Sequence, residues 1–135
     1  MKNIFNYMLL MSFVLLISCT GDDKNCGRLS CLPNPAVNTA ISNTGKSVIE
    51  TTGGIDGIVI FQYGTTVKAY DKHDPNRCTT EPNSTLTLSS DKLFLISDDG
   101  EYFLLQNGQP TKGISCRSLI QYRTSSSGML ITITD

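Results

Sequence analysis

The feature that most restricts the fold is a series of short β-prone runs, each closed by a turn signal, from residue 48 to the C-terminus. Residues 57–63 are rich in β-branched and aromatic side chains, Gly64 interrupts them, and residues 65–70 alternate polar with apolar side chains. Such a pair is typical of a β-hairpin. No segment carries a sustained apolar stripe at helical spacing. The sequence therefore predicts an all-β fold, a small antiparallel sandwich or barrel.

Further strands are expected over runs of the same kind, at residues 48–52, 84–89, 93–96, 102–105, 119–123 and 129–134. Turns are expected at residues 97–100, at Asn107-Gly108 and at residues 125–128. Residues 20–44 differ, because they are rich in Asn, Gly, Thr, Ser and Pro and have little periodicity. That composition predicts an irregular lead-in to the β-domain.

The first residues have the character of an export signal. Lys2 precedes an eleven-residue apolar run at residues 7–17, which is shorter than the roughly 20 apolar residues of a spanning helix. The run ends in Leu16-Ile17-Ser18-Cys19, which resembles the bacterial lipobox. That resemblance implies a signal peptide over residues 1–18 and a lipidated Cys19 carrying acyl chains such as palmitate. The alternative is an ordinary signal peptide with a chance cysteine.

The residues after Cys19 bear on location. Asp22-Asp23 is similar to the surface-export signal of lipoproteins in some Gram-negative lineages, and the alternative is a solvated tether. We expect a flexible tether over residues 19–45, and an outer-membrane protein that is lipid-anchored and exposed at the cell surface. A multiply acylated anchor gives stable attachment, so the lipid bilayer is an expected partner.

Size and charge limit the other possibilities. The chain has 135 residues and a formal net charge of −1, with a pI of about 5.7. That length allows one domain, which we place at residues 46–135, and the charge balance offers no footprint for nucleic acid.

Four cysteines remain once Cys19 is set aside: Cys26, Cys31, Cys78 and Cys116. An even number in an oxidising compartment favours two disulfides, for which three pairings exist. Cys26 and Cys31 lie close together in a Gly- and Asn-containing stretch, so a local pair is plausible and leaves Cys78 with Cys116. Zinc binding is disfavoured, because Cys78 and Cys116 have no neighbouring thiol.

The order of elements from residue 46 onward resembles a Rieske-type domain. In that family a hairpin ends in Ala–aromatic–Asp and enters a Cys-Pro-His loop, and Ala69-Tyr70-Asp71 and Pro75 match those parts. Gly100-Glu101-Tyr102-Phe103 matches the latter half of the family's second loop. The closing parts follow in the same order, at Asn107-Gly108-Gln109-Pro110, Leu119-Ile120-Gln121-Tyr122 and Gly128-Met129-Leu130-Ile131. The resemblance implies a Rieske-like β-domain.

The same resemblance places the family's four cluster ligands at Asp74, Asn76, Ile96 and Asp99. A Rieske 2Fe–2S centre needs two thiolates and two imidazoles, and none of these four residues supplies either. The resemblance therefore implies a kept fold and a lost cofactor, and we expect no 2Fe–2S cluster. We also expect a Cys78–Cys116 disulfide to replace the cluster as the cross-link between the loops.

Two classes of function follow. The favoured one is a non-enzymatic envelope lipoprotein that binds a partner, whose identity the sequence does not give, through the former cluster loops. The alternative is a metal-dependent electron-transfer protein with an unusual centre at Asp74, Asn76, Asp99 and His73. No catalytic residue is assigned, because no serine or threonine stands at triad spacing from His73, the one histidine. The acidic loop residues are those of tight turns as well as of Ca²⁺ sites.

Overall fold

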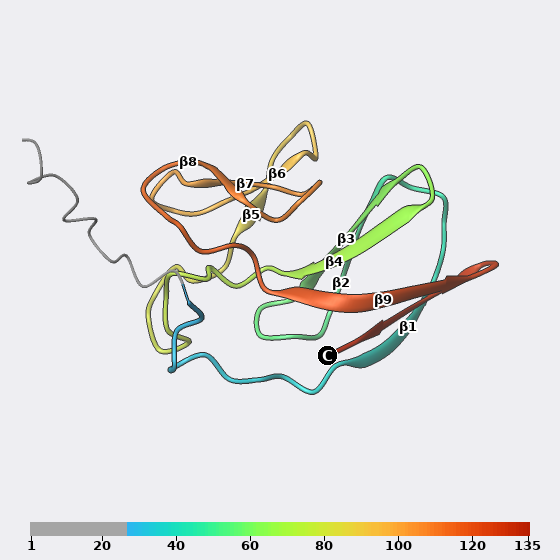
Figure 1. Ribbon diagram of the computed structural model, residues 1–135, viewed down its shortest axis with the longest axis horizontal. Coiled ribbons are helices and arrows are strands. Elements are labelled where there is room, and N and C mark those ends of the chain that lie inside the picture. The colour runs from blue at the N-terminus through green and yellow to red at the C-terminus, as the bar shows by residue number, and fades with distance from the viewer. Residues whose placement is uncertain (1–26) are drawn as a thin grey trace, which may run out of the picture.

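The computed structural model describes residues 27–135, which form two antiparallel sheets (Figure 1). The larger sheet has six strands in the order β1-β10-β9-β4-β3-β2, and the smaller has four in the order β5-β6-β7-β8. The strands are β1 Asn38–Ser42, β2 Val48–Thr51, β3 Ile58–Tyr63, β4 Thr66–Asp71, β5 Thr87–Leu88, β6 Phe94–Ile96, β7 Tyr102–Leu104, β8 Pro110–Lys112, β9 Gln121–Ser127 and β10 Leu130–Thr134. The all-β prediction is confirmed.

The smaller sheet is an insertion between two neighbouring strands of the larger one. The chain leaves β4 at Asp71, builds β5 to β8, and returns as β9, whose Tyr122 lies opposite Ala69 of β4. The hairpin predicted around Gly64 forms between β3 and β4, and a second hairpin forms between β9 and β10. The turn expected at residues 125–128 lies instead at Gly128-Met129, because Ser125, Ser126 and Ser127 pair with β10 as part of β9. The tips of both hairpins lie at the right of Figure 1, away from the smaller sheet.

Strand β3 is buried on both faces, which explains its unbroken apolar run. Ile58 and Ile60 point into a core formed within the larger sheet, together with Val37, Ala69, Tyr122, Ile131 and Ile133. Val59 and Phe61 point the other way into the core between the sheets, with Val48, Tyr70, Leu86, Leu95, Phe103, Leu105 and Leu119. Because successive side chains of a strand alternate faces, one β-branched segment supplies both cores.

The irregular lead-in predicted over residues 20–44 is wrong in its later part. Residues 38–42 form β1, which pairs with β10 and sets Ile41 opposite Ile131. Val37, just before β1, is 4% exposed. The strand has only one large apolar side chain, and its partner β10 is distant in sequence, so local composition does not reveal it.

Strand β8 was also missed, since Pro110 and Gly113 mark a loop in the sequence. The structure places Pro110–Lys112 at the edge of the smaller sheet, paired only with β7. Proline lacks a backbone donor and is confined to such edge positions. An edge strand with one paired side is therefore compatible with this composition.

Candidate functional site

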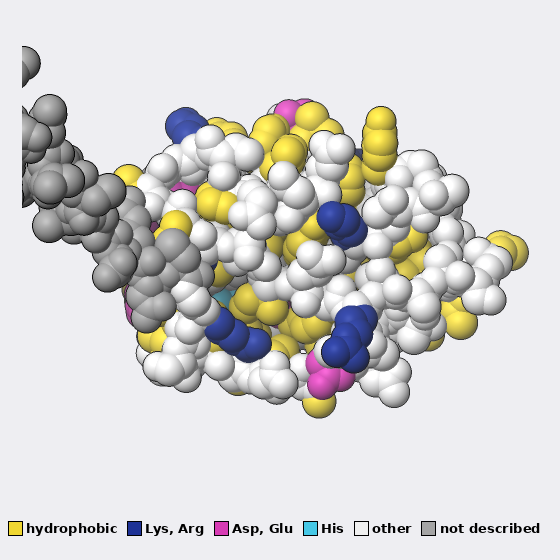
Figure 2. Space-filling model, in the orientation of Figure 1, with side chains coloured by type: hydrophobic (Ala, Val, Ile, Leu, Met, Phe, Trp, Pro, Cys, Tyr) yellow, Lys and Arg dark blue, Asp and Glu magenta, His cyan; other side chains and the backbone are white. Residues whose placement is uncertain are grey.

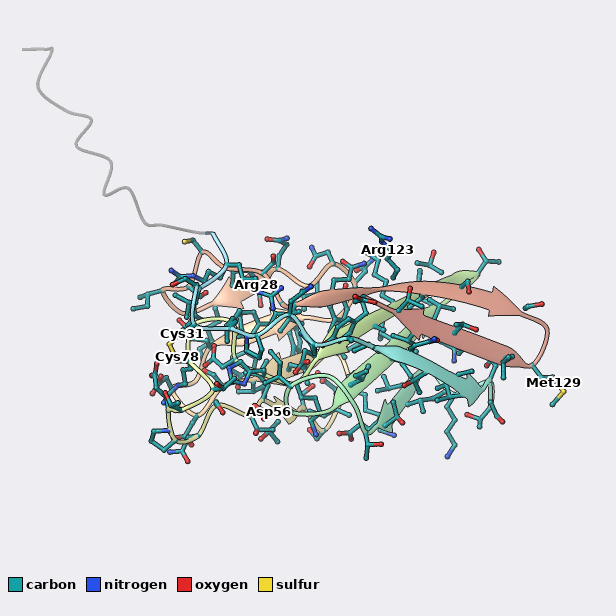
Figure 3. All side chains as sticks on the ribbon, turned by 90° about the horizontal axis from the view of Figure 1, so that it is seen from below. Arg28, Cys31, Asp56, Cys78, Arg123 and Met129 are labelled. Atoms are coloured by element: carbon teal, nitrogen blue, oxygen red, sulfur yellow. A yellow bond between two sulfur atoms is a disulfide. The ribbon has the colours of Figure 1, made fainter. Side chains whose placement is uncertain are left out.

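Three loops come together at one end of the domain. The first, residues 72–86, joins β4 to β5; the second, residues 97–101, joins β6 to β7; the third, residues 113–120, joins β8 to β9. The segment before β1, residues 27–37, reaches the same end, which we call the loop end. Figure 3 shows it as the end that carries Cys31 and Cys78, opposite the hairpin tip at Met129.

The carboxylate of Glu101 joins all three loops. Glu101 is only 9% exposed. Its Oε2 accepts a hydrogen bond from Asn76 Nδ2 at 2.8 Å, and its Oε1 accepts from the backbone nitrogens of Ser115 at 2.9 Å and Ile114 at 3.2 Å. Hydrogen bonds to an ionised acceptor are stronger than neutral ones. A Cβ on Gly113 would lie 2.6 Å from Glu101 Cγ, so the third loop approaches this closely only with glycine there.

Asn76 makes the second set of links between the first and third loops. Its Oδ1 accepts a hydrogen bond from Ser115 Oγ at 2.9 Å, and its Nδ2 donates to Asp74 Oδ1 at 3.1 Å as well as to Glu101. Asp74 is 1% exposed and also accepts from the backbone nitrogen of Asn76 at 2.9 Å. Every polar atom of the Asn76 amide is therefore bonded within the loop end.

Arg77 ties the first loop to the second at the rim of the site. Its Nη2 donates to Asp99 Oδ2 at 2.5 Å, and its Nε lies 3.6 Å from Asp74 Oδ2. The hydrogen bond with Asp99 raises the pKa of the Arg77 guanidinium above its ordinary value. Asp99 is largely exposed, so this ion pair contributes little stability on its own.

The cysteine pairing differs from the prediction. Cys31 is bonded to Cys78, across 47 positions of sequence, so neither the local Cys26–Cys31 pair nor the Cys78–Cys116 pair forms. Cys116 is also disulfide-bonded, and Cys19 and Cys26 lie outside the described residues. The error came from sequence proximity, which says nothing about where the lead-in folds: it returns to the first loop and brings Cys31 beside Cys78. In the chain-entropy description such a loop contributes about 4 kcal/mol.

His73 has a structural place behind the loop end. It is fully buried, its Nδ1 lies 2.5 Å from Asp56 Oδ2, and its Nε2 lies 3.0 Å from the backbone oxygen of Arg77. Ser84 Oγ donates to the same Asp56 oxygen at 3.2 Å. The serine thus contacts the carboxylate and not the imidazole, and both ring nitrogens already face acceptors. This is not the arrangement of a nucleophile with its general base.

A second buried carboxylate, Asp71, lies at the end of β4, in the region of His73 behind the loop end. It accepts hydrogen bonds from the backbone nitrogens of Ile55 at 2.6 Å, Asp56 at 3.1 Å and His73 at 2.8 Å, and from the Tyr122 hydroxyl at 2.5 Å. Burial and the bond to Asp71 raise the pKa of Tyr122 well above its ordinary value. Burial alone raises the pKa of Tyr70 to about 12. The sequence marked Asp71 only as part of a motif and gave no sign of its four donors.

The four positions that the Rieske resemblance assigns to cluster ligands do not all face one another. Asp74 and Asn76 are bonded together, and Asp99 is held beside them through Arg77. Ile96 ends β6 and lines a different hollow, with Ser84, Thr87 and Ser97. In residues 27–135 no three His, Cys, Asp or Glu side chains converge as a metal site would require.

The loop end also carries a surface hollow of about 660 Å³, lined by Asn76, Glu101, Ile114 and Arg117 among others. Ile114 is 84% exposed at its border. Ile114 and Ser115 were missed in the sequence, because no pattern of side chains marks the third loop. The signal for Glu101 was the Gly-Glu-Tyr-Phe match, which located the loop but not the role of the carboxylate.

The comparison with solved structures agrees with this architecture. The chain is similar to the ferredoxin of carbazole 1,9a-dioxygenase from Nocardioides aromaticivorans IC177, with a TM-score of 0.50 and 13% sequence identity, over 73% of this chain and 96% of that one. No protein-family model and no curated protein matches the sequence. The domain is therefore an all-β domain of the Rieske-type ferredoxin fold. At this level of identity the likeness concerns the fold alone.

Proposed function

We propose that the protein is a lipid-anchored envelope protein whose Rieske-like domain carries no iron–sulfur cluster and serves as a non-enzymatic binding module. The observation that carries the proposal is the hydrogen-bonded closure of the loop end. Asn76 bonds to both Asp74 and Glu101, and Asn76 and Glu101 each bond to Ser115 of the third loop. Polar side chains thus join the segments that a cluster would otherwise hold.

The donor set supports the absence of a cluster. A Rieske centre takes two thiolates and two imidazoles. The chain has one histidine, and its two ring nitrogens face Asp56 and a backbone carbonyl. Cys31, Cys78 and Cys116 are all disulfide-bonded, so none of these three sulfurs is a thiolate. The residues of the loop end therefore do not fit the group that the fold family carries.

The binding role rests on the shape of the loop end. Its hollow of about 660 Å³ falls within the usual size of a ligand or partner pocket. Exposed loops on a rigid scaffold are where binding residues gather. The lipid anchor rests on Leu16-Ile17-Ser18-Cys19, which lies outside the described residues. Within residues 27–135, no helix has the length and apolar character needed to cross a membrane.

The anchor is tested by expressing the full chain in a Gram-negative host fed with an alkyne-labelled fatty acid. We expect the label on the wild type and none on Cys19→Ser. The matched control is Cys26→Ser, which leaves the lipobox intact and should keep the label. Equal labelling of wild type and Cys19→Ser would overturn the anchor, and protease treatment of intact cells would show whether the domain is at the cell surface.

The absence of a cluster is tested on the same wild-type preparation, purified without chelator. We expect no stoichiometric iron by elemental analysis and no visible charge-transfer bands. Iron and acid-labile sulfide in equal amounts, with such bands, would mean that the protein is an electron carrier of the Rieske type. That result would overturn the assignment of the loop end as a hydrogen-bonded closure.

A further inference from the structure

The segment before β1 is fastened across the loop end at several points. The backbone oxygen of Gly27 accepts a hydrogen bond from Arg117 Nε at 2.9 Å, Cys31 is bonded to Cys78, and Leu32 is 7% exposed. We call residues 27–37 the strap. Figure 3 shows Arg28 and Cys31 of the strap at the end of the molecule opposite Met129. The chain therefore enters the folded domain at the loop end.

Little chain separates this entry point from Cys19. Seven residues, 20–26, lie between Cys19 and Gly27. Consecutive residues advance at most about 3.3–3.6 Å, so the distance from Cys19 to Gly27 is at most about 29 Å whatever its conformation. An acyl group on Cys19 would therefore hold the loop end within that distance of the lipid headgroups, because the strap from Gly27 onward is fixed to the folded domain.

The side chains at the entry point suit a lipid–water interface. Ile114 is 84% exposed on the third loop, and Arg117 of the same loop bonds to Gly27. Arg28 lies next to Gly27 and is exposed. An exposed apolar side chain with cationic side chains nearby is the combination that inserts at headgroup level. Of the acids on these loops, Asp74 and Glu101 are buried and Asp99 is paired with Arg77, which leaves Glu81 and Asp98 as the exposed acids of the first and second loops.

We infer that the strap and the short segment before it seat the loop end on the lipid bilayer surface, with Ile114 at the headgroups and the β3–β4 and β9–β10 hairpin tips pointing away. This inference rests on the proposed lipidation of Cys19. It names the bilayer itself as the partner of the loop end. Tyr63 and Met129 are 69% and 81% exposed at the hairpin tips, and in this orientation they face away from the bilayer.

The chain has no tryptophan, so the fluorescence of a single introduced tryptophan reports only on the position where it is placed. Ile114→Trp and Met129→Trp form a matched pair, since the two side chains are 84% and 81% exposed and neither belongs to a core. The full-length acylated protein is reconstituted into phosphatidylethanolamine–phosphatidylglycerol vesicles that contain a headgroup-level nitroxide lipid. We expect Ile114→Trp to lose most of its emission and Met129→Trp to keep nearly all of its emission.

One further measurement separates this inference from the anchor on which it rests. Mass spectrometry of each reconstituted sample shows whether Cys19 carries acyl chains. Acylated protein with equal quenching at both positions, or with Met129→Trp quenched more, overturns the seated orientation and leaves the anchor standing. Protein without acyl chains removes both.

A longer tether tests whether the short segment between Cys19 and Gly27 is what positions the loop end at the bilayer. Insertion of about 20 Gly and Ser residues after Lys24 adds roughly 25 Å of average reach without touching the folded domain. We expect the quenching of Ile114→Trp to fall clearly in this variant. Unchanged quenching would show that the short segment is not what positions the loop end, and would overturn that part of the inference.

Discussion

Replacing Glu101 by glutamine tests whether this carboxylate joins the three loops. The substitution changes one oxygen into an NH₂ group and leaves the size of the side chain almost the same. If the glutamine oxygen takes the place of Oε1, it still accepts from the backbone nitrogens of Ile114 and Ser115. Its NH₂ group then meets the NH₂ group of Asn76, donor against donor.

No rearrangement of the two amides removes the conflict. Turning the glutamine sets its NH₂ group against two backbone N–H groups. Turning Asn76 sets its oxygen against Asp74 Oδ1, where its NH₂ group now donates at 3.1 Å. A hydrogen bond to a charged group contributes about 1.5–3 kcal/mol, and Glu101 lies at the border of the buried region. We therefore expect Glu101→Gln to lower the free energy of unfolding by about 2 kcal/mol.

The assay is urea unfolding of the oxidised protein, followed by circular dichroism, with the slope of the transition compared between variants. Glu81→Gln is the control, because exposed Glu81 accepts a single hydrogen bond, from the Cys78 nitrogen at 2.8 Å, which a glutamine oxygen keeps. That variant should change the stability by less than about 0.5 kcal/mol. Equal stabilities for Glu101→Gln and Glu81→Gln would refute the joining role of Glu101.

Four other predictions concern the regions behind and beside the site. Tyr70 Oη has no hydrogen-bond partner among the described residues, so Tyr70→Phe should keep or raise stability by up to about 1 kcal/mol, whereas Tyr122→Phe should lose about 2 kcal/mol through its bond to Asp71. Because burial raises the pKa of Tyr70 to about 12, the wild type should lose stability as the pH rises from about 10 to about 12, and urea titrations should show a smaller loss in Tyr70→Phe. Gly54→Ala places a Cβ 2.2 Å from Asp71 Oδ2 and should lower the melting temperature far more than Gly64→Ala, where no atom lies within 4 Å; similar losses would contradict the close approach. Replacing Cys31 and Cys78 together by serine should cost about 4 kcal/mol and expose the strap to protease, and unchanged proteolysis would show that the strap is held without the disulfide.

Sequence patterns located most of the strands, because each has a local cause. The unbroken apolar run from Ile58 to Phe61 indicated a buried strand, and both of its faces are in fact covered. Gly64 marked the turn of the β3–β4 hairpin, where its φ is +59°. Residues 84–89 were predicted as one strand, and the structure keeps only Thr87–Leu88, since the earlier residues belong to the first loop. Whether residues join a short edge strand depends on the neighbouring strands in the fold. Alternation in the local sequence therefore overestimates the length of such a strand.

The candidate site was predicted only in outline. The Rieske-type motif placed Asp74, Asn76, Asp99 and Glu101 in neighbouring loops, and the structure brings those loops together. The motif did not reveal that Glu101 and Asn76 are the joining residues, because their roles depend on the third loop. Ser115 contacts Asn76 across 39 positions of sequence, a separation that no local pattern can report.

By itself, the amino-acid sequence determined the all-β class, the positions of the hairpins and the resemblance to a Rieske-type domain, since these follow from alternation, turn residues and short motifs within the chain. Only the tertiary structure decided that β1 joins the larger sheet, that Cys31 meets Cys78, and that Glu101 is bonded to three loops at once. Each of these contacts joins residues far apart in sequence. Their formation depends on how the two sheets pack, and that packing is a property of the whole chain.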